Sequence, residues 1–248
     1  MRGNVSHAVA SDVGLKRENN EDSYAIVDVG RPFPSALVIA DGMGGHRRGE
    51  LASRIAVDYS QEQLCRVLEK DENPDTMQQI LADICEKANI KVYLGSLDSE
   101  DCRGMGTTLT IAVIYEDQLI LAHVGDCRAY LYRDKSLMRL TIDHTLVQEM
   151  IDSGSLSEAD SKTHPRRNVL TRALGSPENV KADTIRLPLE RGDRIMLCTD
   201  GLHGAVSEAE ILSVLNEENS SEQAVDKLIE LANEKGGEDN ITVLLFSM

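Results

Sequence analysis

Short runs of apolar residues, separated by polar turns, recur along this chain with the length and flanking residues of buried β-strands. They predict strands at 6–11, 23–29, 36–41, 107–115, 118–125, 127–133, 137–141, 182–188, 193–199 and 241–247. Longer segments with helical character predict helices at 48–70, 75–95, 208–216 and 221–235. The last two helices begin with capping-box pairs, Ser207 with Glu210 and Ser220 with Gln223.

The order of the predicted elements is strands, two helices, strands, and two helices again. Strands this apolar need cover, and sheets packed on each other with helix pairs outside provide it. Residues 143–168 differ from the rest because they are polar, mostly helical in tendency and interrupted by Gly154. We interpret them as an appendage laid over the domain. Without a repeat, linker or low-complexity segment, one domain over 1–248 is the simplest organisation.

Composition narrows the class of protein. The chain has 248 residues, 41% of them hydrophobic, which is enough for one substantial core. No apolar run approaches the ~20 residues that cross a bilayer, and the N-terminus lacks the features of a secretion signal. We therefore expect a soluble, cytoplasmic protein without a membrane partner. The net charge of −16 disfavours nucleic-acid binding, because such a surface repels phosphate backbones.

Five cysteines form no CxxC pair and no zinc spacing, and their number is odd, so we expect reduced and mostly buried thiols. Cys127 and Arg133 do match the C-x5-R spacing of cysteine-dependent phosphatases. That chemistry needs a tight loop around phosphate, whereas the intervening RAYLY has no glycine and looks extended. In a strand the two side chains would lie ~20 Å apart, which excludes the mechanism.

Acidic residues stand at the ends of several predicted strands. Asp41 follows ALVIA, Asp126 follows LILAHVG, Asp200 follows RIMLCT, and Asp239 comes shortly before ITVLLF. A single aspartate in such a place is commonly a turn residue or a helix cap. Four in matching contexts, two of them followed by glycine, instead favour a cluster at one edge of the packed sheets.

Such a cluster favours metal chemistry. Several carboxylates within a few Å cannot all stay ionised without a cation, and oxygen ligands favour Mg²⁺ or Mn²⁺ over zinc. Gly42 would let its carbonyl approach such an ion. Two ions ~3.5–4 Å apart can hold a bridging water, lower its pKa and clamp phosphoryl oxygens. Because G-x-S-x-G, Walker A and G-x-G-x-x-G motifs are absent, the residues indicate a metal-dependent hydrolase of phosphate esters.

Together, a series of longer blocks resembles bacterial type-2C (PPM-type) protein phosphatases, which are metal-dependent serine/threonine phosphatases. The blocks occur in the family's order, from Ser11 to Phe246: SDVGLKRENNEDSYAI, ALVIADGMGGHRRGELAS, GMGTTL, HVGDCRAYLYR, DHTLVQEM, HPRRNVLTRALGS, GDRIMLCTDGL and GGEDNITVLL. The resemblance implies an α+β fold, a four-layer α/β/β/α sandwich of two antiparallel sheets flanked by helix pairs. It also implies that the appendage at 143–168 is the family's flap.

The resemblance further implies a metal-ligand set. Asp41 would bridge two Mn²⁺ or Mg²⁺ ions, and the Gly42 carbonyl would bind the first ion. Asp200 and Asp239 would hold the second ion together with Asp41. In bacterial relatives the aspartate matching Asp126 helps to hold a third, weaker ion, shared with the aspartate matching Asp200. Charge count sets the affinity of hard cations, so this ion should be mostly hydrated.

Three further residues match functional positions of the family. Arg17 corresponds to the arginine that grips substrate phosphate, a task that suits the two-pronged guanidinium. Glu21 and Asp22 stand where the family orients metal-bound waters.

The chain also departs from the family pattern. Animal members often carry a histidine, a candidate general acid, where Met43 stands, and nearby His46 receives no role. Cys127 replaces a usual serine. Because it faces opposite to Asp126 in a strand, we interpret it as a buried neutral thiol. The remaining histidines in matched or flanking segments are interpreted as structural: His123, His144, His164 and His203.

We therefore predict a monomeric phosphatase that acts on phosphorylated proteins and reverses bacterial Ser/Thr kinases. One alternative is a phosphatase-like signalling module whose catalysis is secondary or lost. The presence of all four matched aspartates argues against it. Another is a phosphoesterase for small molecules or nucleic acid, which the block order and the net charge disfavour. A basic cluster near the end of the flap, Arg166, Arg167 and Arg172, suggests a docking surface for phosphopeptides.

Overall fold

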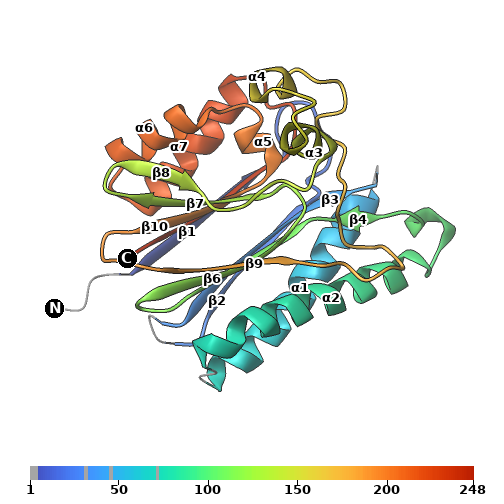
Figure 1. Ribbon diagram of the computed structural model, residues 1–248, viewed down its shortest axis with the longest axis horizontal. Coiled ribbons are helices and arrows are strands. Elements are labelled where there is room, and N and C mark those ends of the chain that lie inside the picture. The colour runs from blue at the N-terminus through green and yellow to red at the C-terminus, as the bar shows by residue number, and fades with distance from the viewer. Residues whose placement is uncertain (1–4, 31–32, 45–46, 71–72) are drawn as a thin grey trace.

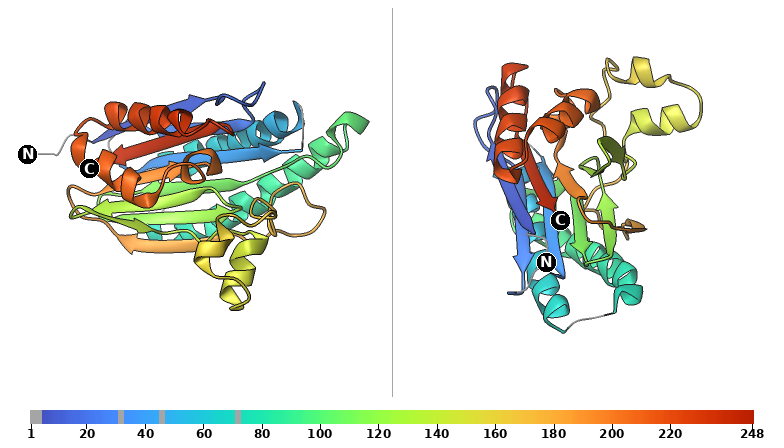
Figure 2. Two further views of the ribbon diagram at one scale, coloured as in Figure 1. Left: turned by 90° about the horizontal axis from the view of Figure 1, so that it is seen from above. Right: turned by 90° about the vertical axis from the view of Figure 1, so that its left-hand side faces the viewer.

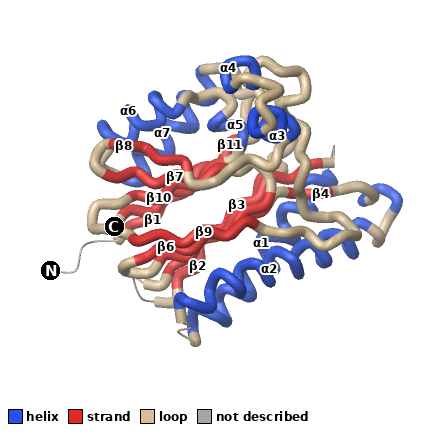
Figure 3. The backbone as a smooth tube through the Cα atoms, in the orientation of Figure 1, coloured by secondary structure: helices blue, strands red, loops and turns tan. Residues whose placement is uncertain are grey.

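Two antiparallel β-sheets pack face to face in the computed structural model, and helices cover their outer faces (Figures 1 and 3). The structure describes residues 5–30, 33–44, 47–70 and 73–248. The strands are β1 (Ser6–Asp12), β2 (Asp22–Asp28), β3 (Ser35–Met43), β4 (Gly106–Thr107), β5 (Leu109–Ile114), β6 (Gln118–Val124), β7 (Arg128–Arg133), β8 (Ser136–Arg139), β9 (Asp183–Pro188), β10 (Arg194–Cys198) and β11 (Ile241–Ser247). The helices are α1 (Arg47–Glu69), α2 (Pro74–Ser96), the 3₁₀ turn η1 (Glu100–Cys102), α3 (Leu146–Asp152), α4 (Glu158–Ser161), α5 (Asp200–His203), α6 (Glu208–Glu217) and α7 (Ser221–Glu234).

The strand order brings distant parts of the chain together. One sheet runs β1-β11-β10-β7-β8, and the other runs β2-β3-β5-β6-β9, with β4 paired to the end of β3. All these pairings are antiparallel. The predicted sandwich of two antiparallel sheets is therefore confirmed.

Strand β3 shows why the central strands are apolar at every position. Leu37 and Ile39 pack between the two sheets, whereas Ala36, Val38 and Ala40 pack against the layer of α1 and α2. Successive side chains of a strand point to opposite faces, and both faces of β3 are covered. A third apolar layer, between the other sheet and helices α5, α6 and α7, completes the four-layer arrangement.

Local capping chemistry sets several helix starts. The Ser207 side chain accepts a hydrogen bond from the Glu210 N–H, and Glu210 accepts in return from the Ser207 N–H, which confirms the predicted capping box. At Ser220 the side chain accepts from the Gln223 N–H. The sequence pattern did not predict η1 and α5, because elements of three or four residues are too short to show periodicity.

The flap is a separate excursion from the sandwich. It contains α3 and α4 and projects from the body of the molecule (Figure 2). Its two ends are joined, because the Leu146 N–H donates to the Val169 carbonyl and Thr145 bridges to Leu170. In the described residues, no helix has the length and apolar character that crossing a membrane requires.

Candidate active site

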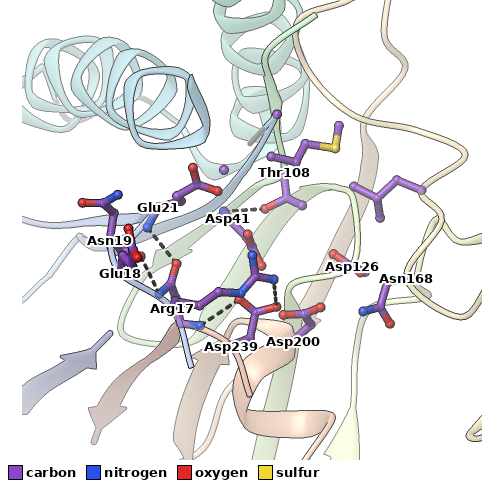
Figure 4. A pocket seen from close by; sticks show the side chains of 15 residues that line it. Arg17, Glu18, Asn19, Glu21, Asp41, Thr108, Asp126, Asn168, Asp200 and Asp239 are labelled. Carbon is purple, nitrogen blue, oxygen red and sulfur yellow. Dashed lines mark hydrogen bonds and ion pairs between the residues drawn. The ribbon is translucent and has the colours of Figure 1, made fainter. Parts of the chain in front are cut away.

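A pocket of about 390 Å³ lies at one edge of the sandwich, where ends of strands from both sheets meet (Figure 4). Asp41 comes from the end of β3, Asp126 from the turn after β6, Asp200 from the start of α5 after β10, and Asp239 from the loop before β11. The structure thus brings together the four aspartates that the sequence placed at strand ends.

Asp41 is held through its backbone by two neighbouring threonines. Its N–H donates to the Thr108 hydroxyl at 2.8 Å. Its carbonyl accepts from the Thr107 hydroxyl at 2.8 Å and from the Thr108 N–H at 2.9 Å. Three hydrogen bonds therefore fix the direction in which the Asp41 side chain enters the pocket. Sequence reasoning missed these threonines, although they form the TT of the GMGTTL block.

Gly42 is required by the close approach of α1. A Cβ atom at this position would lie 2.0 Å from the Gly49 carbonyl oxygen and 2.7 Å from the Glu21 carbonyl oxygen. The sequence-based argument attributed this glycine to the approach of an ion. The structure gives a different and sufficient reason, which is backbone packing between β3, α1 and the segment before β2.

Burial and mutual repulsion make the pocket carboxylates reluctant to ionise. Burial, followed by the charges of Asp22 and Asp200, raises the pKa of Asp41 well above its usual range. Burial and the charge of Asp200 do the same to the pKa of Asp126. The pKa of Asp200 rises to about 6, through burial and then the charge of Asp239.

Asp239 and Arg17 form an ion pair at the mouth of the pocket. The Arg17 Nη2 atom donates to Asp239 Oδ2 at 2.7 Å, and the side chains are 51% and 28% exposed. The loop carrying Arg17 is tied down by Asn240, whose amide accepts from the Glu21 N–H and donates to the Val13 and Asn19 carbonyls. Asn240 is a second positioning residue that the sequence analysis did not single out.

Glu21 and Asp22 occupy different places. The Glu21 side chain lines the pocket, and partial burial raises the pKa of its carboxyl. Asp22 is not among the lining residues. Its Oδ2 atom accepts from the hydroxyls of Thr199, at 2.9 Å, and Thr242, at 2.7 Å. Burial raises the pKa of Asp22 to about 7.

The donor set fits hard divalent cations. The buried Oδ1 atoms of Asp22 and Asp200 have no hydrogen-bond partner within the described part of the chain, which is costly unless something else neutralises them. Across the same residues, no three His, Cys, Asp or Glu side chains stand as a ready-made ligand group. Two features oppose a tight cluster: the pocket carboxylates repel one another, and Asp239 already pairs with Arg17. Oxygen donors with raised pKa values at one pocket are nevertheless the ligands that Mg²⁺ and Mn²⁺ prefer.

Other predicted residues lie as follows. Met43 lines the pocket and is 38% exposed, whereas His46 lies outside the described residues. Cys127 is a buried free thiol, 3.1 Å from the Thr108 hydroxyl. Arg133 lies at the opposite end of β7 and pairs with Asp193, so the C-x5-R spacing is a coincidence, as expected.

The histidines have partners within the protein. His123 contacts the Thr110 hydroxyl and the Ile142 carbonyl, His203 donates to the Asp126 carbonyl, and the His164 ring accepts from the Arg166 N–H. His144 bonds to Gly125 and Asp183. Two of these histidines, His144 and His203, therefore hold the turn that carries Asp126.

The flap contributes the remaining wall of the pocket. Asn168, at its C-terminal end, and Leu170, just after it, are lining residues. Arg166 and Arg167 are exposed. Arg172, by contrast, donates to Asp183 at 2.7 Å and to the Lys181 carbonyl, so its guanidinium is engaged within the protein. The predicted basic cluster is thus reduced to two exposed arginines.

The carboxylate-lined pocket at one edge of the four-layer α/β/β/α sandwich suits the metal-dependent hydrolysis of phosphate esters. The family model for Protein phosphatase 2C matches residues 16–245. The chain belongs to this family.

Several named proteins are similar to this chain over nearly their whole lengths. "Serine/threonine phosphatase stp" of Listeria monocytogenes is 37% identical over 238 residues, which cover 95% of this chain and 92% of the relative. "Protein phosphatase PhpP" of Streptococcus pneumoniae is 37% identical over 244 residues, or 97% and 96%. Among solved structures, the S. agalactiae serine/threonine phosphatase is 34% identical, with a TM-score of 0.91 and coverage of 99% and 100%.

Proposed function

We propose that this protein hydrolyses phosphoserine and phosphothreonine in other proteins. The supporting observation is that four strand-end aspartates and Arg17 line one pocket. Among the residues that line it, Arg17 is the only one with a positively charged side chain. Family membership and the serine/threonine phosphatases among the relatives support the same conclusion.

Asp41, Asp200, Asp239 and the Gly42 carbonyl would hold two Mn²⁺ or Mg²⁺ ions, and Asp126 with Asp200 a third, weaker one. A structure of the catalytic domain of the phosphatase PstP, 34% identical to this chain with a TM-score of 0.83, is in complex with two manganese ions. When bound, such ions supply positive charge for phosphoryl oxygens and lower the pKa of water. The raised pKa values of Asp41 and Asp126 support this assignment, because both carboxylates lack sufficient positive partners.

Arg17 is the substrate-gripping residue of this proposal. Its guanidinium is half exposed at the pocket mouth and pairs with Asp239. A phosphate group can accept two of its N–H donors at once, so it would replace or share the Asp239 contact. Arg17 thereby places the phosphorus atom next to Asp41. Glu21, whose side chain lines the same pocket, would accept hydrogen bonds from water and orient it. Asp22, the next residue, would assist in orienting water, although its Oδ2 atom already accepts from the Thr199 hydroxyl.

The wider role follows from the substrate class. We propose that the protein acts as a monomeric single domain in the cytoplasm and reverses the action of a Ser/Thr kinase. Five free cysteines accord with a reducing compartment. Phosphoproteins that accumulate when the gene is deleted would identify its substrates, and size-exclusion chromatography would test the monomer.

Hydrolysis of a phosphothreonine peptide and of p-nitrophenyl phosphate, with Mn²⁺ and with a chelator, tests the proposal. We expect turnover only with metal. Asp41→Asn and Asp239→Asn should lower it by at least on the order of 100-fold, since even residues that only support metal ligands cost 10–100-fold. Asp58→Asn, an exposed change on α1, is the matched control and should leave turnover unchanged. Full turnover in chelator, or wild-type rates in either pocket variant, would rule out the metal mechanism.

A further inference from the structure

His144 holds the residue that precedes Asp126 by both of its backbone polar groups. The Gly125 N–H donates to His144 Nδ1 at 3.0 Å, and the His144 N–H donates to the Gly125 carbonyl at 2.8 Å. The imidazole is almost fully buried, with 6% of its side chain exposed. One side chain and its own backbone therefore determine how the chain leaves β6 and enters the turn.

The partners of the ring fix its tautomer. Because Nδ1 accepts the Gly125 N–H, the proton of the neutral ring lies on Nε2. That Nε2–H donates to Asp183 Oδ2 at 3.0 Å, and Asp183 is paired with Arg172 at 2.7 Å. Arg172 thus anchors the carboxylate, the carboxylate orients the imidazole, and the imidazole holds Gly125.

The turn held by His144 has little freedom on its other sides. Gly125 has a φ of +110°, in the region that favours glycine. A Cβ atom there would lie 2.4 Å from the Thr108 methyl group, so the turn packs directly on the residue that also holds Asp41. On the far side, His203 Nε2–H donates to the Asp126 carbonyl at 3.0 Å. With the turn confined by Thr108 and His203, the hydrogen bond to His144 Nδ1 sets the direction of the Gly125 N–H.

We propose that His144 is a positioning residue that aims the Asp126 carboxylate into the pocket. The inference rests on the proposed function in one respect, namely that Asp126 helps to hold the weakest of the bound cations. His144 touches neither substrate nor cation in this scheme. It acts through the Gly125–Asp126 turn, in the way that residues behind metal ligands orient them.

The end of the flap is connected to the same histidine. The Thr171 N–H donates to the His144 carbonyl at 2.9 Å, and Arg172 is the next residue along the chain. His144, at the start of the flap, therefore connects the residues just after the flap to the turn that carries Asp126. Leu170, which directly precedes Thr171, lines the pocket.

Two amide variants separate the contacts of the ring. An asparagine amide oxygen can take the place of Nδ1, so His144→Asn keeps an acceptor for Gly125 and loses the Asp183 contact. A glutamine amide reaches the place of Nε2, so His144→Gln keeps the Asp183 contact and leaves the Gly125 N–H unpaired. His123→Asn is the matched control, because His123 is the neighbouring buried imidazole, with ring centroids 4.8 Å apart, and bonds to Thr110 and Ile142 instead.

Mn²⁺ binding, measured calorimetrically and by the electron paramagnetic resonance of free Mn²⁺, is the primary readout. We expect His144→Gln to weaken the weakest Mn²⁺ site on the order of tenfold while the tighter pair is retained. It should lower kcat for p-nitrophenyl phosphate with little change in KM. His144→Asn should recover most of both effects, and His123→Asn should show neither. In an Asp126→Ala background, His144→Gln should cause no further loss of Mn²⁺.

Several outcomes would overturn the inference. One is that His144→Gln binds Mn²⁺ as the wild type does while Asp126→Ala loses a site, and another is that both amide variants weaken all sites equally. Unchanged Mn²⁺ binding in Asp126→Ala would also defeat it, because Asp126 would then hold no cation. If His144→Gln does not fold, His144→Asn must still retain the weak site. If the wild type cleaves no phosphopeptide although the variants alter Mn²⁺ binding as expected, the proposed function fails and the positioning role stands.

Discussion

At the scale of single residues, the pocket concentrates negative charge that the protein itself does not neutralise. Asp41, Asp126 and Asp200 all have raised pKa values, each caused first by burial and then by other carboxylates. Arg17 offsets part of the charge of Asp239 from the pocket mouth. Bound hard cations would neutralise these carboxylates and so make the cluster favourable.

Asp126→Ala tests the third cation at this scale. The variant should keep the central pair of ions, lower turnover by roughly tenfold and raise the Mn²⁺ concentration needed for activity, because only the most weakly held ion loses a ligand. Activity measured across a Mn²⁺ titration, beside calorimetric binding, checks this. Loss of the central pair, or an unaltered rate and metal dependence, would show that Asp126 does not have this role.

Thr108 provides a second residue-scale prediction. Thr108→Val preserves the shape of the side chain but removes the hydroxyl that accepts the Asp41 N–H. Leaving that donor unpaired should cost about 1–3 kcal/mol of unfolding free energy and weaken Mn²⁺ binding. Denaturant unfolding and Mn²⁺ calorimetry measure the two effects. Thr108→Ser keeps the hydroxyl and serves as the control; if it weakens Mn²⁺ binding as much as valine does, the hydroxyl is not the cause.

At the scale of elements, most of the pocket is built from strand ends and from the turns and loops beside them, and the flap adds one wall. Strand β3 is buried on both faces and carries Asp41 near its end, and β10 leads through Thr199 into α5, which begins at Asp200. The flap, by contrast, meets the sandwich at its two joined ends, and Asn168 at its end and Leu170 just after it line the pocket. Its exposed arginines, Arg166 and Arg167, are not among the residues that line the pocket.

Reversing the charge of Arg166 and Arg167 tests peptide docking by the flap. The double change to glutamate should lower kcat/KM for a phosphopeptide by roughly tenfold, through lost attraction to an acidic partner, and affect p-nitrophenyl phosphate much less. Lys87→Glu with Lys91→Glu, two exposed changes on α2, alters the net charge equally and is the control. Equal effects on both substrates would remove the docking hypothesis.

At the scale of the whole molecule, the active edge is also where the two sheets are joined by polar contacts. Asp22, on β2 of one sheet, accepts hydrogen bonds from Thr199 and Thr242, which belong to the other side of the sandwich. Its second oxygen is buried and has no hydrogen-bond partner in the described ranges. The apolar interior between the sheets thus ends, at this edge, in a carboxylate that favours its protonated form.

Asp22 makes the stability of the metal-free protein depend on pH. Its folded pKa of about 7 lies above the unfolded value near 3.9, so protonation stabilises the folded state. That stabilisation is present at low pH and is lost as pH rises through about 7. In chelator, the Tm of Asp22→Asn relative to the wild type should therefore rise as pH increases from about 4 to about 7 and level off above about 7. A difference between the two proteins that stays constant with pH would contradict this assignment; Asp58→Asn, which is exposed, controls for the loss of one charge.

The sequence by itself determined the main strands and long helices, the layer arrangement and the aspartates at strand ends, because these depend on local hydrophobic periodicity and on residue types at fixed places in it. Asp41, Asp126, Asp200 and Asp239 could be chosen for that reason. Only the tertiary structure showed what surrounds them. The bonds from Thr108 to Asp41 and from Gly125 to His144 join residues 67 and 19 positions apart. The reason for Gly42 likewise depends on where α1 approaches β3. Such contacts follow from how separate elements pack, and no local pattern in the chain encodes that packing.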